Sequence, residues 1–428
     1  MGSKWEYIPL GELITLQRGH DLPSQHRIDG PVPIMGSSGI TGFHNIAKAI
    51  GPGVIVGRSG DSMGVVSFIE KDYWPLNTCL YITDFKGNDI TYIYYLLKLV
   101  NFDNFNSGSA QKSLNRNAVY PHKVLATKDR ELQKKIGAIL SSFEERIINS
   151  NKINQTLEQM SQTLFKSWFV DFDPVIDNAL DAGNSIPEAM QSRAELRQKV
   201  RNSADFKPLP ADIRALFPAE FEETELGWTP KSWKVSGLGK EFNITMGQSP
   251  SGSTYNEHEI GLPFFQGKTD FGFRFPSKRI YCTEPKRLAK KFDTLLSVRA
   301  PVGVTNLAST ECIIGRGLAA LRHKSGNIAF TYYSVRNLSD YFSIFNGEGT
   351  VFGSINQKDL KQLPLICPST KLINKFEEFS GKWERMISVH CNEIESLSNL
   401  RDTLLPKLIS GELSLEDLPD IIKQTEAA

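Results

Sequence analysis

The sequence has few cysteines, no long apolar run and no complete catalytic signature. Its five cysteines are odd in number and widely spaced, and no two form a Cys-x-x-Cys pair. This pattern disfavours structural zinc and a disulfide framework, and it fits a reducing compartment. No segment approaches the ~20 apolar residues of a membrane span, and no secretory signal opens the chain. We therefore expect a cytoplasmic protein with no membrane partner.

Motifs for nucleotide or metal chemistry are incomplete. Gly267-Lys268-Thr269 resembles the end of a P-loop, but Leu262 stands where the first glycine belongs. The sequence Gly315-Arg316-Gly317 fits a loose dinucleotide pattern, yet a turn follows it in place of a crossover helix. The seven histidines form no metal-spaced set, and no Asn-Pro-Pro-Tyr-like base-binding motif is present. We predict no catalytic residue, no metal and no cofactor.

Charge is unevenly distributed along the chain, although the total is only +1. Residues 228–370 hold 18 Lys and Arg against 10 Asp and Glu, a net charge of +8. Residues 126–227 and 371–428 each carry a net charge of −4. The basic segment indicates a polyanionic partner.

Two long helical patterns organise the sequence. From about Glu131 to Phe169, apolar residues recur at steps of three and four, which predicts a helix roughly 60 Å long. The apolar spacing is expected to shift at residues 149–151, which are all polar; this shift is called the polar slip. A second stretch from Phe376 to Leu408 repeats the pattern 240 residues later. The apolar stripe along one face of each helix is here called its seam. The seam of the first helix is predicted to comprise Ile136, Leu140, Phe143, Ile147, Ile153, Leu157, Met160, Leu164 and Trp168. Two such helices can bury their seams by packing antiparallel; two unrelated surface helices are the plainer alternative.

The segments that precede these helices are also repeated. Trp5, Gly19 and Pro33 match Trp233, Gly247 and Pro263. Further matches join residues 54–58 to 295–299, which aligns Arg58 with Arg299, and residues 108–115 to 349–356. Short runs of Val, Ile, Phe and Tyr, interrupted by Pro and Gly, predict strands with a few small helices. The chain is therefore a tandem duplication of one globule and one long helix.

We predict an α+β protein with two tandem α/β recognition globules, joined by two long antiparallel, coiled-coil-like spacer helices about a pseudo-two-fold axis. The predicted segments are a first recognition domain (1–125), a central spacer helix (126–170), a connector (171–227), a second recognition domain (228–370), a C-terminal spacer helix (371–412) and a tail (413–428).

Polar loops beside basic residues suit DNA, because small residues admit phosphates and Arg, Lys, Asn and Gln read base edges. Arg58 and Arg299 are favoured because they recur at the ends of equivalent strands; a structural salt bridge made twice is the alternative. Lys290 and Lys291 are candidates for phosphate contacts. The predicted DNA-binding residues are Ser38, Thr41, His44, Arg58, Ser59, Ser109, Lys112, Asn115, Arg116, Lys268, Thr269, Arg274, Lys278, Arg279, Arg299, Thr350 and Asn356.

Several sequence segments, spread over nearly the whole chain, resemble segments of the specificity (S) subunit of type I restriction-modification systems. Trp233 with Leu238-Gly239 is similar to the opening of the family's repeat unit, and residues 132–140 (LQKKIGAIL) to the start of its spacer helix. Residues 404–413 (LLPKLISGEL) are similar to its C-terminal ending. The first helix departs from that ending with FKSWFVDF at residues 165–172, so the two helix ends need not contact a partner identically.

The resemblance implies that each globule reads one half of a split, asymmetric site in double-stranded DNA. It also implies helices that set the spacing and dock two methyltransferase (M) subunits, which motor-nuclease (R) subunits join. The S subunit itself would not be the catalyst. Two alternatives remain from the residues alone: a coiled-coil scaffold or regulator without base readout, and a stand-alone nucleotide enzyme.

Overall fold

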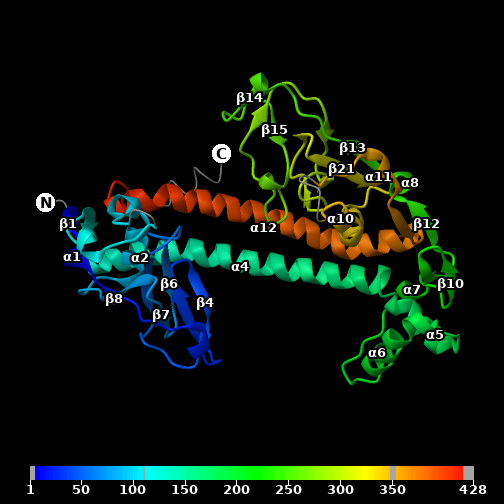
Figure 1. Cartoon of the computed structure of the whole chain (residues 1–428), viewed down its shortest axis with the longest axis horizontal. Coiled ribbons are helices and arrows are strands. Elements are labelled where there is room, and N and C mark those ends of the chain that lie inside the picture. The colour runs from blue at the N-terminus through cyan, green and yellow to red at the C-terminus, as the bar shows by residue number, and fades with distance from the viewer. Residues whose placement is uncertain (1–4, 109–110, 348–352, 418–428) are drawn as a thin grey trace. The chain divides into compact units, whose positions relative to one another are not determined.

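The computed structural model describes residues 5–108, 111–347 and 353–417. It contains helices and sheets throughout, which confirms the α+β class (Figure 1). The chain divides into two compact units. Unit 1 comprises Met1–Asn149 and Glu393–Ala428, and unit 2 comprises Ser150–Asn392.

Two long helices, α4 (Arg130–Phe169) and α12 (Thr370–Ser410), contribute one half each to both units. In unit 1, Glu144 pairs with Arg401 at 3.2 Å and Arg146 pairs with Glu393 at 2.6 Å. The partner's number falls as the α4 number rises, so the two helices are antiparallel there. In unit 2, Phe165 and Trp168 at the end of α4 pack on Phe376 near the start of α12, which gives the same direction.

The seam of α4 differs from the prediction in its second half. Ile153 and Met160 are 44% and 43% exposed, whereas Asn154 and Ser161 are buried. Steps of three and four therefore continue through the middle of the helix without a slip, and polar side chains occupy the inward positions. Asn154 is held there because its side chain hydrogen-bonds His390 of α12 at 3.1 Å. The predicted slip was wrong because apolar character was taken as the sign of burial.

Unit 1 is built around a sheet of order β2-β8-β5-β6, with a second sheet of order β4-β3-β7 and the pair β1-β9. The run Gly53–Gly57 is buried throughout and forms a central strand, as expected for β-branched residues between sheet neighbours. Its strands are β1 (Trp5–Pro9), β2 (Thr15–Arg18), β3 (Val32–Gly36), β4 (Gly39–His44), β5 (Gly53–Gly57), β6 (Val66–Ile69), β7 (Trp74–Pro75), β8 (Cys79–Asp84) and β9 (Lys123–Thr127). Its short α-helices are α1 (Leu10–Leu13), α2 (Ile90–Lys98) and α3 (Arg116–Val119).

Unit 2 repeats this plan with a sheet of order β13-β21-β18-β19, a five-stranded sheet β14-β16-β15-β20-β17 and the pair β12-β22. Its strands are β12 (Lys234–Gly237), β13 (Phe242–Met246), β14 (Tyr255–Asn256), β15 (Leu262–Phe265), β16 (Tyr281–Cys282), β17 (Leu288–Ala289), β18 (Thr294–Ser297), β19 (Thr305–Leu307), β20 (Cys312–Ile314), β21 (Leu318–His323) and β22 (Pro364–Cys367). Its short α-helices are α8 (Leu238–Glu241), α9 (Ile328–Arg336), α10 (Ser339–Ile344) and α11 (Gln357–Gln362).

The corresponding helices α2 and α9 contact the long helices in different ways. Gly137 of α4 lies near the start of α2. A Cβ atom added at this glycine would lie 3.1 Å from the carboxylate of Asp89, the residue that caps α2. At the corresponding place α12 carries Glu377, whose carboxylate accepts hydrogen bonds from the first backbone amides of α9, including Ile328 at 2.9 Å. Burial raises the pKa of Glu377, and these amides oppose the rise. Both arrangements satisfy the free amides of a helix start.

The segment predicted as a connector is folded into short helices and a pair of strands. Its elements are α5 (Asp173–Ala182), a 3₁₀ turn (Glu188–Met190), α6 (Gln191–Arg201), α7 (Ala211–Arg214), β10 (Phe221–Thr224) and β11 (Gly227–Pro230). Carboxylates spaced by four residues on α5 meet arginines with the same spacing on α6, including Asp173 with Arg193 and Asp177 with Arg197. These ion pairs join α6, which is largely polar, to α5, whose Val175 and Ile176 are buried.

Candidate nucleic-acid interface

Unit 1 contains an open groove of about 690 Å³, here called groove 1. Its described lining residues are Gln17, Arg18, Arg58, Leu80, Ser107, Ser113, Leu114, Asn115 and Arg116. Arg58 follows β5, and its guanidinium donates to the Asn77 carbonyl at 3.3 Å. Arg116 at the start of α3 donates to the Leu16 carbonyl at 3.0 Å. Both arginines are therefore oriented by backbone carbonyls and keep further donors for a ligand.

Unit 2 contains a comparable groove of about 540 Å³, here called groove 2. Its described lining residues are Ser249, Gln266, Gly267, Lys268, Thr269, Arg299, Ala300, Pro301, Arg316 and Gly317. The Asp270 carboxylate accepts a hydrogen bond from the Gln266 amide at 2.7 Å and orders the turn that carries Lys268. Arg299 and Arg316 are exposed.

Both grooves lie next to the residues that follow the equivalent strands β5 and β18, but they are lined from different backbone positions. Gly19 and Gly247 lie beside them. A Cβ atom added at Gly19 would lie 2.1 Å from the Leu76 carbonyl oxygen, and one added at Gly247 would lie 2.1 Å from the Gly315 carbonyl oxygen. Each glycine therefore allows the same close approach of two chain segments, which explains why it recurs in both halves. Each groove brings together three cationic side chains and several amide or hydroxyl groups, and none of its described lining residues is acidic.

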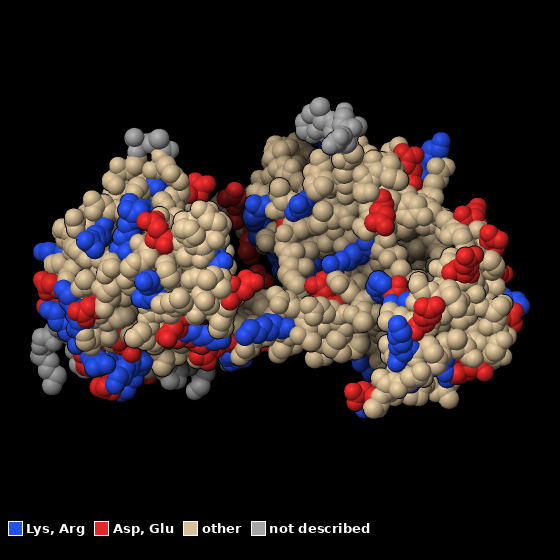
Figure 2. Space-filling model, turned by 60° about the horizontal axis from the view of Figure 1, so that its bottom comes forward, with Lys and Arg blue, Asp and Glu red and all other residues tan. Residues whose placement is uncertain are grey.

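Surface charge outside the grooves does not by itself locate an interface. Figure 2 shows Lys and Arg interspersed with Asp and Glu over the visible face, with no large area of one sign. The grooves differ from this background because their described linings are cationic and polar. That combination suits phosphates and base edges.

The structure corrects the predicted equivalence of Arg58 and Arg299 by one residue. The backbone amide of Arg58 donates to the Thr78 carbonyl, and the Arg58 carbonyl accepts from the Leu114 amide. In unit 2 the matching bonds are made by Val298, whose amide donates to Gly317 and whose carbonyl accepts from Ile355. Arg299 instead corresponds to Ser59. Arg299 forms an isolated β-bridge with Ser354, and Ser59 forms the equivalent β-bridge with Ser113. Both arginines line a groove, but from adjacent backbone positions.

The predicted DNA-binding residues divide into several groups. The grooves include Arg58, Asn115, Arg116, Lys268, Thr269 and Arg299. Ser59 and Lys112 lie beside groove 1, where Ser59 bridges Ser113 and Lys112 pairs with Asp103 at 2.7 Å. Five of the predicted residues are exposed but do not line either groove: Ser38, Thr41, Lys278, Arg279 and Asn356. Asn356 caps α11. Ser109 and Thr350 lie outside the described residues.

Two of the predicted contacts are buried and are withdrawn. Arg274 has no exposed surface; it lies between Glu158 and Glu384, with its guanidinium 4.3 Å from the centre of the Tyr332 ring. His44 is 4% exposed, packs against Trp74 and hydrogen-bonds the backbone of Ile28. Both were selected for their residue type within a loop-like sequence, which contains no information on burial.

Sequence reasoning missed several groove residues. They are Gln17, Arg18, Ser249, Gln266 and Arg316. Two signals were available, because Arg18 directly precedes the repeated Gly19 and Arg316 lies within the incomplete dinucleotide motif. In the structure that motif is the turn between β20 and β21.

Known proteins resemble this chain in sequence and in fold. Residues 2–159 match the family described as "Type I restriction modification DNA specificity domain". The putative type I restriction enzyme MjaX specificity subunit of Methanocaldococcus jannaschii is 27% identical over 306 residues, which cover 71% of this chain and 70% of that protein. The type I restriction enzyme HindI specificity subunit of Haemophilus influenzae is 28% identical over 314 residues, which cover 67% and 68%.

A crystal structure of the type I restriction-modification system S subunit from M. genitalium shares the fold. Its TM-score is 0.61 at 18% identity, and the match covers 95% of this chain and 96% of that chain. In sequence the chain is thus similar to type I restriction-modification specificity subunits, and it shares the fold of one of them. This similarity supports a DNA-recognition role without catalysis by the chain itself.

Two features are absent from the part of this chain that the structure describes. No helix there is both long and apolar enough to cross a membrane. Within the same residues, no group of three or more His, Cys, Asp or Glu side chains is arranged to hold a metal ion.

Proposed function

We propose that each globule of this chain reads one half of a split, asymmetric site in double-stranded DNA, with groove 1 or groove 2 facing the duplex. Recognition is assigned to residues 1–125 and 228–370. The occurrence in each globule of a groove with three cationic side chains and no acidic residue in its described lining, next to the end of β5 or β18, carries the proposal. The antiparallel halves of α4 and α12 would set the distance between half-sites and dock two methyltransferase subunits, which motor-nuclease subunits would join in the cytoplasm.

The charge of the lining residues supports DNA as the ligand. Arg and Lys supply salt-dependent affinity through phosphates, and Arg with Gln or Asn supplies base discrimination. A scaffold without base readout would have no use for two cationic grooves. Mapping of the adenines that the assembled complex methylates tests the proposal, because a scaffold would leave the methylated sequence unchanged when groove residues are altered.

Replacing groove arginines is expected to alter sequence discrimination in one half-site at a time. Arg58→Ala should change discrimination by about 1–3 kcal/mol in the first half-site, and Arg299→Ala should do so in the second. Methylation rates on single-base variants of the target measure both effects. An Arg58→Ala protein that melts earlier but keeps its discrimination would show that Arg58 only orders the Asn77 turn.

Neutralising exposed lysines is expected to weaken DNA binding without changing its sequence preference. Lys290 and Lys291 are exposed in the second globule, so Lys290→Ala with Lys291→Ala should lower affinity for every sequence alike. The slope of log affinity against log salt should fall by about 0.9 for each phosphate that the protein no longer neutralises. Titration of specific and unrelated duplexes at several salt concentrations separates this effect from base readout.

Lengthening the helix pair is expected to change the preferred gap between half-sites. One heptad added to both helices, next to Asn149 in α4 and next to Asn392 in α12, keeps both seams in phase and adds about 10 Å. At about 3.4 Å per base pair, the preferred gap should grow by roughly three base pairs. The same insertion in α4 alone is the control and should abolish methylation, because it misaligns the pair. Undiminished methylation at the original gap by the doubly extended protein would contradict a spacing role.

A further inference from the structure

Two of the three arginines in groove 1 are held by main-chain carbonyls through the same nitrogen atom. Arg58 donates from Nη1 to the Asn77 carbonyl at 3.3 Å. Arg116 donates from Nη1 to the Leu16 carbonyl at 3.0 Å. Within the described residues, neither guanidinium forms an ion pair or a further hydrogen bond. Each therefore keeps the edge formed by Nε and Nη2, whose two parallel N–H groups can donate to one ligand.

The Asn77 carbonyl belongs to a turn that other contacts hold in place. The Asn77 backbone amide donates to the His20 carbonyl at 3.1 Å, and the Asn77 side-chain amide donates to Asp21. The neighbouring Thr78 carbonyl accepts from the backbone amide of Arg58 at 2.9 Å. The acceptor that holds the Arg58 guanidinium is thus fixed by bonds that do not involve the Arg58 side chain.

The Leu16 carbonyl is fixed in a similar way. Leu16 is 1% exposed, and the Tyr120 hydroxyl accepts from its amide at 2.9 Å and donates to its carbonyl at 3.0 Å. Arg116 itself begins α3, and the Asn115 side chain caps this helix by accepting from the Asn117 amide. Both the backbone and the guanidinium of Arg116 are therefore ordered before a ligand binds, which reduces the side-chain entropy lost on binding.

The other arginines of the two grooves lack such an anchor. Arg18 of β2 is exposed in groove 1, and Arg299 and Arg316 are exposed in groove 2. Within the described residues, none of these three side chains forms a hydrogen bond or an ion pair. Long exposed cations of this kind suit phosphates, which carry no sequence information. Anchored arginines thus distinguish groove 1 from groove 2 in the described part of the chain.

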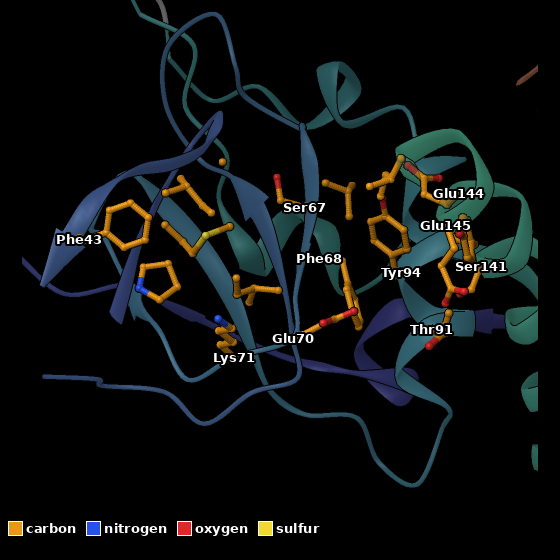
Figure 3. Close-up of a pocket in the computed structure, with 18 of the residues that line it drawn as sticks. Phe43, Ser67, Phe68, Glu70, Lys71, Thr91, Tyr94, Ser141, Glu144 and Glu145 are labelled. Carbon is orange, nitrogen blue, oxygen red and sulfur yellow. The ribbon is translucent and has the colours of Figure 1, made fainter. Parts of the chain in front are cut away.

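The other large cavity of unit 1, of about 640 Å³, has a different chemical character. Figure 3 shows Tyr94 of α2 with Glu144 and Glu145 of α4 on one side of it. Glu144 is already paired with Lys98 at 3.7 Å and with Arg401 at 3.2 Å. The lining of this cavity includes three glutamates, whereas none of the described lining residues of groove 1 is acidic. Of these two cavities, groove 1 is therefore the one that suits a polyanion.

The free edge of an anchored arginine matches a guanine base in the major groove. Guanine presents N7 and O6 there as two neighbouring acceptors, whereas adenine presents one acceptor and one donor. Two parallel donors on a fixed guanidinium can both bond to guanine, but one of them meets a donor on adenine. Lysine lacks this planar pair of donors, so exchange of arginine for lysine keeps the charge and removes the recognition.

We propose that Arg58 and Arg116 each read one guanine of the first half-site, with the Nε and Nη2 groups donating to N7 and O6. Arg18 contacts a phosphate. This inference rests on the proposed reading of DNA by groove 1, and it adds the identity of two bases. The first half-site therefore contains at least two guanines, on the same strand or on opposite strands.

Replacement of single guanines by 7-deazaguanine tests the assignment on the full-length chain assembled with methyltransferase subunits. This base keeps Watson–Crick pairing but carries C–H in place of N7, so it removes one acceptor. At two guanines of one half-site it should weaken binding roughly tenfold, because a hydrogen bond from a charged donor is lost. Arg58→Lys should abolish the additional loss at one of these guanines, and Arg116→Lys at the other. On unmodified DNA, each variant should reduce the preference for guanine over adenine roughly tenfold or more at its own position.

Arg18→Lys is the matched control, because it keeps the charge in the same groove and alters a side chain that no carbonyl anchors. It should preserve the preference for guanine and the response to 7-deazaguanine at every position. Absence of two responsive guanines in either half-site, or lysine variants that keep the full preference for guanine, would overturn the inference. The scan on the parent protein requires no variant, so it remains decisive if a variant fails to fold.

A separate result would contradict the proposed function itself. If Arg58→Ala with Arg116→Ala leaves the methylated sequence unchanged, groove 1 does not read DNA, and the guanine assignment falls with it. If that double variant changes the methylated sequence while the lysine variants keep the preference for guanine, groove 1 reads DNA but not through paired contacts to guanine.

Discussion

A chain that ends after residue 170 is expected to form a two-fold dimer and, with methyltransferase subunits bound, to methylate an inverted repeat of the first half-site. In unit 1 of the intact protein, Leu397, Leu404 and Leu408 of α12 are buried in the same apolar cluster as Ile136 and Leu140 of α4. Truncation removes these three leucines and exposes the α4 seam to water. At roughly 1.5–3 kcal/mol for each large side chain, reburial by a second copy is strongly favoured.

The duplication supplies the replacement side chains. Leu157, Leu164 and Trp168 lie 240 residues before the three removed leucines, so a second α4 presents apolar groups at matching positions. A two-fold pair of such halves carries the same globule twice, and its target becomes symmetric.

Light scattering after size exclusion measures the assembly, and methylation mapping measures the target. The matched control is the same truncated chain with Leu140→Asp and Phe143→Asp, which places charges in the seam and should prevent pairing. A truncated chain that remains a folded monomer would contradict both the helix-pair assignment and the spacing role.

Arg274→Ala is expected to destabilise unit 2 by about 3–5 kcal/mol and to leave groove 2 intact. The substitution removes the cation that lies beside Glu158 and Glu384, and Glu384 is 2% exposed. A buried carboxylate without its counter-charge is far more costly than a missing surface ion pair. Hydrogen exchange at the amides of α9 measures the destabilisation locally, with the amides of α2 in unit 1 as an internal reference.

The destabilisation should depend on pH in a defined direction. Burial raises the pKa of the Glu384 carboxyl in the folded protein, and removing Arg274 removes a charge that opposes this rise. A carboxyl whose folded pKa lies above its unfolded pKa binds protons more strongly when folded, so stability increases as pH falls through the folded pKa. The Arg274→Ala protein should therefore recover part of its stability on acidification.

Arg279→Ala is the matched control, because this arginine is 60% exposed and pairs with Asp270 on the surface. It should remain within about 1 kcal/mol of the parent protein. Unchanged exchange in α9 after Arg274→Ala, together with altered base discrimination, would instead identify Arg274 as a DNA-binding residue.

The sequence by itself determined the duplication, the two long helices and the α+β class. These features depend on local spacing: apolar residues at steps of three and four specify a helix wherever it lies, and a repeated order of Trp, Gly and Pro specifies a repeated chain path. Gly19 and Gly247 recur because each must allow a carbonyl oxygen to approach within a distance that excludes any side chain. Such constraints act between the backbone and one residue type, so they appear directly in the letters.

Tertiary structure alone decided which polar side chains are inside and which basic residues share a groove. Asn154 lies in the seam and Met160 outside it, because His390 supplies a hydrogen-bond partner for the asparagine. Arg274 resembles any loop arginine in the sequence, and only the approach of Glu158, Glu384 and Tyr332 buries it. Burial of a polar group depends on partners far away in the sequence, and no local pattern contains that information.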